Sequence, residues 1–567
     1  MKKIKLEKIR MNLVEDKKNQ SRSGPPFTFE CDSSAQLPHL YAIDPSIDQV
    51  ITMILPTVPV KLYKIGKQEE FAVAAVESPL SPILKLIKTT GIYAISSVAP
   101  PLVSLVLAPL LTHHLSPSDY GILIILNLLI SLGAGISQLG LPSAFFRAYN
   151  YDYNLYSDQR DVLATVTMLL CIVSILMTIG VTILSSFLAQ LLFGQSMLGG
   201  LVAMAGGVIL LQNLTVPGFA LLRAESRAFS YSLLSIGNLL ITLLGTIVLV
   251  VVFHLGIAGS LIANGCGYAS VLSYMLPMTL LRSGLKIRTD IARNVLAFGL
   301  PLVLNYVSYW MLQLSDRYLL SLFRSLAQTA LYAVAYTMGS VISILIITPF
   351  TLAWPIVMFN VAKREDATEV FRLLFRWFSL FLLFAAFGLS LLGTVVLDWL
   401  FPISYHSSAF IIPIVAISIV LFGLYYIFMT GANVKRKTWL TAVFTTISAL
   451  VNISLNLILI PLYGSMGAAV STLLAYIVLV LVAYVINQRI YPIPFETGIF
   501  ISALLLGIAL YSGSGFLAQT QGTFGAWSLS LTALALYSGC LVCFGMWATQ
   551  SHKNKHTYLQ VRKDYAS

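Results

Sequence analysis

Charged side chains are scarce in this sequence of 567 residues, and their scarcity excludes most soluble proteins. Asp, Glu, Lys and Arg make up 10% of the chain, whereas 57% of the residues are hydrophobic and the mean hydropathy is +0.84. A soluble domain carries roughly 25% charged residues. A soluble enzyme with an ordinary hydrated surface is therefore excluded.

Long stretches of the chain contain no charged residue. Four stretches contain no Asp, Glu, Lys or Arg at all, namely residues 162–222, 228–281, 438–488 and 497–552. A membrane-spanning helix needs about 20 apolar residues, so each stretch is long enough for two helices and a turn. The sequence thus predicts an all-α polytopic membrane protein.

Motifs for metal, nucleotide or disulfide chemistry are missing or incomplete. Cys540 and Cys543 form a CxxC pair inside an apolar stretch without a second pair, which favours packing over metal binding. Gly431–Thr438 approximates a phosphate-binding loop, but Arg436 stands where the second glycine must be. We therefore expect no metal, no cofactor and no ATP hydrolysis.

From about residue 86 onward, the sequence predicts about fourteen transmembrane helices. Very short turns join several of them, such as His254–Ile257 and Leu462–Ser465. The approximate cores are 90–112, 119–141, 162–184, 199–222, 231–253, 258–280, 293–314, 328–353, 374–397, 409–432, 439–461, 466–487, 497–517 and 526–548.

The net charge of +12 is distributed unevenly between the two sides of these spans. Basic residues precede the first span and follow the even-numbered spans, whereas Arg317 and Arg324 follow span 7. The 35 Lys and Arg residues divide 33 to 2 in this way. Because cytoplasmic loops carry the excess of Lys and Arg, we expect both termini to be cytoplasmic. The positive charge then reflects topology and not nucleic-acid binding.

Residues 1–84 and 551–567 differ in composition from the membrane region. The first segment holds 11 of the 35 Lys and Arg and 10 of the 23 Asp and Glu. Its start, MKKIKLEKIR, is followed by no apolar core, which argues against a signal peptide. We expect a poorly ordered cytoplasmic extension, with a misassigned start codon as the alternative, and a cytoplasmic tail at the other end.

The two halves of the membrane region resemble each other at an offset near 209 residues. The matching pairs are Ser116–Leu123 with Ser325–Tyr332, Arg227–Ser230 with Lys437–Leu440, and Gly256–Gly259 with Gly464–Gly467. Repeats of six helices share one orientation, and transporters built this way hold their substrate at the repeat interface. We predict an N-lobe (85–285), a C-lobe (286–490) and two extra helices (491–550).

Three segments carry motifs typical of one transporter family. They are Ala108–Leu123 (APLLTHHLSPSDYGIL), Pro217–Ser235 (PGFALLRAESRAFSYSLLS) and Phe298–Leu320 (FGLPLVLNYVSYWMLQLSDRYLL). The sequence resembles the polysaccharide-exporter branch (Wzx-type flippases) of the multidrug/oligosaccharidyl-lipid/polysaccharide flippase superfamily. The three segments are similar to that family's first loop, its loop between helices 4 and 5, and its helix 7. The likeness covers residues 86 to about 490 and leaves out the N-terminal extension.

The resemblance implies a transporter, and no enzyme, that flips a polyprenyl-pyrophosphate-linked oligosaccharide across the cytoplasmic (inner) membrane for surface polysaccharide biosynthesis. It implies alternating access between two six-helix lobes, driven by an ion gradient or the membrane potential. The expected partners are the lipid-linked oligosaccharide, membrane lipids and proteins of polysaccharide assembly, with no nucleic acid.

Ionisable residues inside a membrane are functional candidates, and three lie near the end of span 7. Asp316 and Arg317 end this span, and Arg317 and Arg324 break the charge rule. They are candidates for phosphate attraction or for gating at the outer mouth. The alternative is an ordinary interfacial pair at a helix end, and adjacent side chains on a helix need not meet.

Span 7 also carries polar and aromatic residues on one helical face, which suits a cavity that holds sugars. The alternative is interhelical hydrogen bonding together with an interfacial aromatic belt. The residues are Asn305, Tyr309, Gln313 and Asp316, flanked by Tyr306 and Trp310, with Tyr332 and Tyr336 on one face of span 8.

Arg147 and Arg223 lie at the predicted cytoplasmic mouth. They are candidates for the first contact with a diphosphate. The positive-inside rule by itself is the alternative explanation for both.

Other functions compete with oligosaccharide flipping. A cation-coupled multidrug exporter of the same superfamily would need a membrane carboxylate in the N-lobe, where the spans hold none except Asp119 at an end. A membrane polysaccharide polymerase or ligase would need a large external loop, and every predicted external loop is short. A peptidoglycan-precursor flippase would have basic residues in its first helix, and Gly91–His113 lacks them.

Overall fold

The computed structural model describes residues 63–64, 71–72, 98–153, 155–518 and 528–546, which belong to two compact units, Met1–Pro82 and Ile83–Ser567. In the first unit, β1 (Tyr63–Lys64) pairs antiparallel with β2 (Phe71–Ala72). The rest of the predicted extension 1–84 and the predicted tail 551–567 lie outside the described residues.

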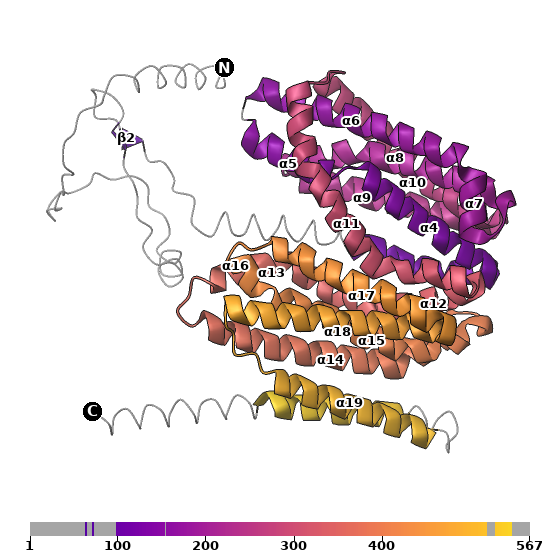
Figure 1. Ribbon diagram of the computed structural model, residues 1–567, viewed down its shortest axis with the longest axis vertical. Helices are drawn as coiled ribbons and strands as arrows, with labels where there is room; N and C mark the ends of the chain where they lie inside the picture. Colours follow the sequence, from indigo (N-terminus) through magenta and orange to yellow (C-terminus); the bar gives the residue numbers. More distant parts are fainter. Residues whose placement is uncertain (1–62, 65–70, 73–97, 154, 519–527, 547–567) are drawn as a thin grey trace, which may run out of the picture. The chain divides into compact units, whose positions relative to one another are not determined.

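The described part of the second unit is built from helices (Figure 1). Those of its first half are the helix Val98–His114, α4 (Pro117–Ser137), α5 (Leu141–Arg147), η2 (Ala148–Asp152), α6 (Tyr156–Ile183), α7 (Ser185–Phe193), η3 (Ser196–Leu198), α8 (Gly199–Ala224), α9 (Ala228–Thr246), η4 (Ile247–Val252) and α10 (Gly256–Ser283).

The second half continues with α11 and its successors. They are α11 (Thr289–Phe323), α12 (Leu326–Gly339), η5 (Ser343–Ile347), α13 (Thr348–Val361), α14 (Ala367–Leu400), η6 (Ile403–Ile411), α15 (Ile412–Phe428), α16 (Thr430–Val434), α17 (Trp439–Tyr463), α18 (Ser465–Ile490), α19 (Thr497–Ala518) and the helix Ser528–Met546.

The two segments that open predicted spans 2 and 8 begin their helices with the same device. The side chain of Ser116 accepts a hydrogen bond from the backbone N–H of Asp119 (3.1 Å), with Pro117 in the first turn of α4. Ser325 accepts from the N–H of Gln328 (3.2 Å) at the start of α12. Serine caps satisfy a backbone donor that has no partner inside the helix, and proline there lacks that donor. The cap is therefore a shared feature of the internal repeat.

In the described part of the chain, twelve helical segments are long and apolar enough to cross a membrane. Each matches a predicted span, and the predicted all-helical membrane architecture is confirmed. The predicted span 90–112 is described only from Val98, as the shorter helix Val98–His114, and the predicted span 258–280 coincides with α10. The number of fourteen transmembrane helices therefore stays a prediction.

The two halves repeat one packing scheme. In the first half, α9 packs against α10, α10 against α8, and α8 against α6. In the second half, the corresponding helices pack in the same order, with α17 on α18, α18 on α15, and α15 on α14. Figure 1 shows each set as one group of neighbouring helices. The repeat inferred from the sequence offset thus has a structural counterpart.

The long helix α11 packs against both halves. Near its start, Ile291 and Val295 are buried in a cluster that contains Phe145, Val162 and Leu221 of the first half. Farther along, α11 packs against α12, α17 and α18. The change of partner occurs within the helix, because its first turns complete the core of the first half. The lobe boundary at 285/286 stays a prediction.

A backbone contact brings the turn after α4 against α11. Gly140 has a φ of +66°, and a Cβ atom added to it would lie 2.3 Å from the carbonyl oxygen of Gly299. A positive φ and a contact this close both require glycine. This contact holds the first third of α11 against the first half.

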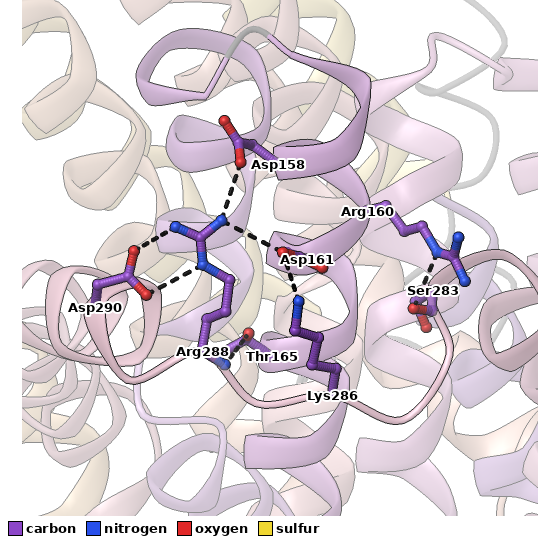
Figure 2. A network of polar contacts seen from close by, with 8 residues as sticks. All are labelled: Asp158, Arg160, Asp161, Thr165, Ser283, Lys286, Arg288 and Asp290. Carbon is purple, nitrogen blue, oxygen red and sulfur yellow. Dashed lines mark hydrogen bonds and ion pairs between the residues drawn. The ribbon is translucent and has the colours of Figure 1, made fainter.

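The connector between α10 and α11 is bound to the start of α6 by charged side chains (Figure 2). Arg288 donates hydrogen bonds to Asp158 (3.0 Å), Asp161 (3.3 Å) and Asp290 (2.6 Å). Lys286 lies 3.4 Å from Asp161. The hydrogen bonds to Asp290 and Asp161 raise the pKa of Arg288 above its usual range. Exposed pairs contribute little one by one, but a network shared by three carboxylates fixes the connector in place.

The last two helices are attached to α14 by a buried ion pair. The Arg376 guanidinium, 1% exposed, donates from Nε and Nη2 to the carboxylate of Glu496, just before α19. Its Nη1 donates to the carbonyl oxygen of Gly545 (3.3 Å) in the helix Ser528–Met546. Removing one partner of a buried pair leaves an uncompensated charge in a poor solvent. We call this the Arg376 clamp.

We expect Glu496→Ala to destabilise the protein by about 3 kcal/mol, because Arg376 would stay buried without its carboxylate. Thermal unfolding of the purified full-length protein in detergent measures the effect. Asp366→Ala is the matched control, since Asp366 pairs with Arg364 and the two side chains are 48% and 59% exposed. Such exposed pairs are worth less than about 1 kcal/mol. Equal melting temperatures of the two variants would contradict the clamp.

Candidate functional site

The helix that carries most of the predicted site is longer than expected. The predicted span ended near residue 314, whereas α11 continues through Phe323. The placement of Asp316 and Arg317 at a helix end is therefore wrong, because the apolar residues that follow them extend the helix. Asp316 is 2% exposed and Arg317 is 8% exposed. An ordinary interfacial pair would be hydrated, so this alternative does not fit.

Asp316 is surrounded by neutral hydrogen-bond donors from neighbouring helices. Its Oδ2 accepts from the hydroxyl of Tyr332 on α12 (2.5 Å) and from that of Thr472 on α18 (3.4 Å). On α17, Asn456 donates to Asn452 (2.9 Å), which donates to Thr472 (3.4 Å). These five residues form the Asp316 cluster, and none is more than 3% exposed.

The Asp316 cluster is unusual in a membrane interior because it combines one carboxylate with the oxygen atoms of several hydroxyl and amide groups. The Oδ1 atom of Asn456 is buried and has no hydrogen-bond partner among the described residues. A carboxylate in a poor solvent is costly unless it is protonated or balanced by a cation. Small hard cations prefer oxygen ligands. The cluster is therefore suited to exchange a proton or a small cation.

The Arg317 guanidinium contacts residues outside the Asp316 cluster. It lies 4.4 Å from the centre of the Tyr336 ring on α12 and donates to the carbonyl oxygen of Gln313 (3.3 Å). Tyr336 in turn donates to the side-chain oxygen of Gln313 (3.2 Å). Among the described residues, no carboxylate forms an ion pair with Arg317. Its other donors are the kind that bind phosphate oxygens.

Aromatic rings from four helices form a group that includes Tyr336, the ring in contact with Arg317. The Phe422 ring on α15 is 6.4 Å from Tyr309 on α11, 5.4 Å from Tyr426, and 5.3 Å from Tyr476 on α18. Tyr476 also interacts with Tyr336. We call these five residues the aromatic cluster. Tyr309 is 42% exposed, so the cluster has an accessible edge. Flat rings with polar hydroxyl groups suit contacts with sugars.

Arg324, the second basic residue that breaks the charge rule, has a different environment. Its guanidinium donates to the carbonyl oxygens of Ile460 (3.1 Å) and Pro461 (2.5 Å). These carbonyls belong to the last turn of α17, where a helix leaves acceptors without partners and favours a cation. Arg324 is thus bound to a helix end, and the structure does not bring it together with Arg317.

The predicted stripe on α11 and its flanking residue Tyr306 have different neighbours. Tyr306 donates to the carbonyl oxygen of Ser131 on α4 (2.8 Å), and a Cβ atom on Gly135 would lie 2.0 Å from its ring. Asn305 is exposed. Gln313 and Asp316 face α12 and α18 instead. Tyr309, Gln313 and Asp316 of the stripe thus contact residues of the second half, whereas the flanking Tyr306 contacts the first half.

Arg147 and Arg223 each lie over an aromatic ring. The Arg147 guanidinium is 4.8 Å from the Phe298 ring and 3.5 Å from the Asp152 carboxylate. The Arg223 guanidinium is 5.7 Å from the Tyr231 ring. Their role at the cytoplasmic mouth stays a prediction.

Sequence reasoning missed Asn452, Asn456 and Thr472. The first two are spaced four apart, on one face of a helix, within the charge-free stretch 438–488. That spacing was a usable signal for a buried polar contact. The partners of Asn452 and Asn456 could not be predicted from the sequence, because Thr472 and Asp316 lie on other helices.

The solved structures that share the fold include one flippase and two other transporters. The lipid II flippase MurJ in an inward closed conformation has a TM-score of 0.64 at 14% identity, covering 81% of this chain and 98% of that chain. An inward-facing multidrug resistance MATE family transporter of the MOP superfamily has a TM-score of 0.54 at 14% identity, covering 70% and 97%. A MOP superfamily transporter from Pyrococcus furiosus has a TM-score of 0.53 at 13% identity, covering 72% and 95%.

No curated protein matches the sequence. The family described as "Polysaccharide biosynthesis protein" matches residues 110–410, more than half of the chain, and this range includes Asp316 and Arg317. The resemblance carried by the three sequence motifs is thereby confirmed. The chain belongs to this family of polysaccharide biosynthesis proteins and has the fold of the flippases and transporters of the MOP superfamily.

Proposed function

We propose that this protein flips a polyprenyl-pyrophosphate-linked oligosaccharide across the cytoplasmic membrane for surface polysaccharide biosynthesis. Its family and its fold support a transport role. The observation that carries the choice of substrate is the position of Arg317, a buried cation beside the aromatic cluster. A headgroup of this kind joins an anionic pyrophosphate to sugars, so it needs a cation and aromatic faces side by side.

In this proposal, Arg317 binds the pyrophosphate and the aromatic cluster binds the sugars. Arg317 is held by the Tyr336 ring and by the carbonyl of Gln313, so its guanidinium is oriented before the substrate arrives. An oriented guanidinium binds phosphate oxygens in a bidentate manner at a low entropic cost. The rings of Tyr309 and Phe422 then contact the sugars. Alternating access would expose this site to each side of the membrane in turn.

We further propose that the Asp316 cluster couples transport to a cation or proton gradient. Asp316 is buried and the side chains hydrogen-bonded to it are neutral, so its charge is balanced best by an exchangeable cation. It is adjacent in sequence to Arg317 on the same helix, so binding at one residue changes the electrostatic field at the other. No nucleotide is needed for such a cycle.

Export of multidrug cations is the second candidate function. A membrane carboxylate favours it, and Asp316 is one, although it lies in the second half of the chain. Buried Arg317 argues against it, since a desolvated positive charge repels cationic drugs. A polymerase or ligase activity has no observation in its favour here. The cytoplasmic membrane and cytoplasmic termini are supported by the division of basic residues between the two sides.

We expect Arg317→Ala to lower export of lipid-linked glycan by tenfold or more, because a charge-assisted hydrogen bond is worth roughly 1.5–3 kcal/mol. The gene is deleted in the host strain, and the strain is then complemented with each variant. Lipid-linked glycan in the two leaflets and polysaccharide at the surface are then measured, at matched membrane levels of protein.

Arg293→Ala is the matched control, since Arg293 is an exposed basic residue on the same helix. It should restore export fully, and Arg317→Lys should restore it in part. If deletion leaves both the inner-leaflet glycan and the surface polysaccharide unchanged, the proposed function fails. Full export by Arg317→Ala would leave flipping possible but would remove the proposed site.

Tyr309→Ala should weaken export several-fold, because it removes the accessible ring of the aromatic cluster. Tyr309→Phe keeps the ring and should retain most of the activity. The same complementation assay compares the two variants at equal membrane levels. An equal loss in Tyr309→Phe and Tyr309→Ala would show that the hydroxyl group matters and not the aromatic face.

Asp316→Asn should uncouple transport from the ion gradient, since it preserves the shape of the side chain but removes its charge. In vesicles with the purified protein, an imposed sodium or proton gradient should accelerate flipping by the wild type and not by the variant. The control variant is Asp119→Asn, which removes a carboxylate at the exposed start of α4. Asn213→Asp would be a less informative control, because Asn213 is itself buried. A gradient response of Asp316→Asn equal to the wild type's would refute the coupling role.

A further inference from the structure

A cavity of about 260 Å³ lies in the second half of the molecule, away from the proposed transport site. It is bounded by α14, α15, α19 and the helix Ser528–Met546. No residue of α4, α11 or α12 lines it. Its walls include Leu383, Phe387, Ser390, Ile417, Gly507 and Tyr537.

The cavity wall has three hydroxyl-bearing side chains, Ser390, Tyr511 and Tyr537, and two of them already donate to backbone carbonyls. The hydroxyl of Ser390 donates to the carbonyl oxygen of Ala386 (2.7 Å), and that of Tyr537 donates to the carbonyl oxygen of Ala503 (3.0 Å). Buried water needs two to four polar partners, whereas cavities lined by apolar groups stay dry. An occupant of this cavity is therefore a hydrocarbon.

The cavity is also placed where hydrocarbon is the surrounding medium. Its lining residues come from the middle of membrane-spanning helices, such as Ile508 near the centre of α19. The side chain of Ile508 is 45% exposed, so the cavity reaches the surface that faces lipid. The chains of membrane lipids lie at this depth, and a void left unfilled costs stability in proportion to its volume.

Two features keep the walls of the cavity together. The rings of Phe387 and Tyr537 pack with centroids 4.4 Å apart, which joins α14 to the helix Ser528–Met546. The Arg376 clamp ties the same two helices together at one end. The cavity thus lies between attached elements and persists as a built pocket.

We propose that this cavity binds one acyl chain of a membrane phospholipid, as a structural lipid between the second half of the protein and its last two helices. An apolar cavity of about 150 Å³ takes a benzene molecule, so this one has room for a short length of a single chain. The bound lipid completes the packing of α19, and the inference does not depend on the transported substrate.

The test uses the full-length protein in vesicles of phosphatidylethanolamine and phosphatidylglycerol. A trace of phosphatidylcholine carries a photoreactive diazirine in the middle of one acyl chain. After illumination, labelled peptides are identified by mass spectrometry. We expect severalfold more label on residues 383–390 and 504–511 than on the lipid-facing residues of α9, such as Leu233 and Leu244, which are 61% and 59% exposed.

Ser390→Leu fills the cavity and should abolish the extra label. Gly513→Leu on α19 is the matched control, since nothing lies within 4 Å of a Cβ atom at Gly513. It should retain the label. If Ser390→Leu fails to fold, Ala386→Leu fills the same space from the same helix.

Three results would overturn the proposal. In the first, the label is spread evenly over all lipid-facing helices in the wild type, which means that the cavity holds no chain. In the second, a diazirine-labelled polyprenyl phosphate marks the cavity and the phospholipid does not, which assigns the space to the substrate's tail. Loss of label in both Ser390→Leu and Gly513→Leu also counts against a site confined to the cavity.

Discussion

The structure depends on one constraint, which is that hydrocarbon offers no hydrogen bonds. Every polar group at membrane depth must find its partner inside the protein. The backbone meets this demand by forming helices, and side chains meet it by bonding across them. Gln138 donates to Asn213 (3.0 Å), which donates to Ser137 (2.7 Å), far from any proposed site. Most polar residues of the membrane region are explained in this way.

The need for internal hydrogen bonds does not by itself explain why Asp316 and Arg317 are buried at membrane depth. They are adjacent on α11, but a helix turns about 100° per residue, so they enter different surroundings. The carboxylate meets hydroxyl and amide groups, and the guanidinium meets an aromatic ring and a carbonyl oxygen. Neither neutralises the other through a direct ion pair. These two opposite charges, without a direct ion pair between them, are the basis of the proposed cation site and the proposed anion site on a single helix.

The position of α11 makes this separation relevant to movement. Its first turns belong to the packing of the first half, where the Arg288 network binds the connector to α6. Its later turns belong to the second half and carry both charges. Tyr306 lies between these regions and bonds to α4. Any relative motion of the halves must therefore act on α11, the helix that carries the proposed substrate and ion sites.

The sequence by itself determined the membrane fold, the helix positions, the repeat and the family, because hydropathy, charge sidedness and motifs are local properties of the chain. It also identified Asp316, Arg317, Tyr309 and Tyr336 as candidates, since intramembrane charges and aromatic spacing can be counted. The extension of α11 past Asp316 and the partners of that residue were decided by the tertiary structure. Arg324 looked equivalent to Arg317 in sequence, yet only packing shows that it binds the end of α17. Contacts between helices far apart in the chain leave no local signature, so the Asp316 cluster and the cavity beside α19 emerge only when the helices are assembled.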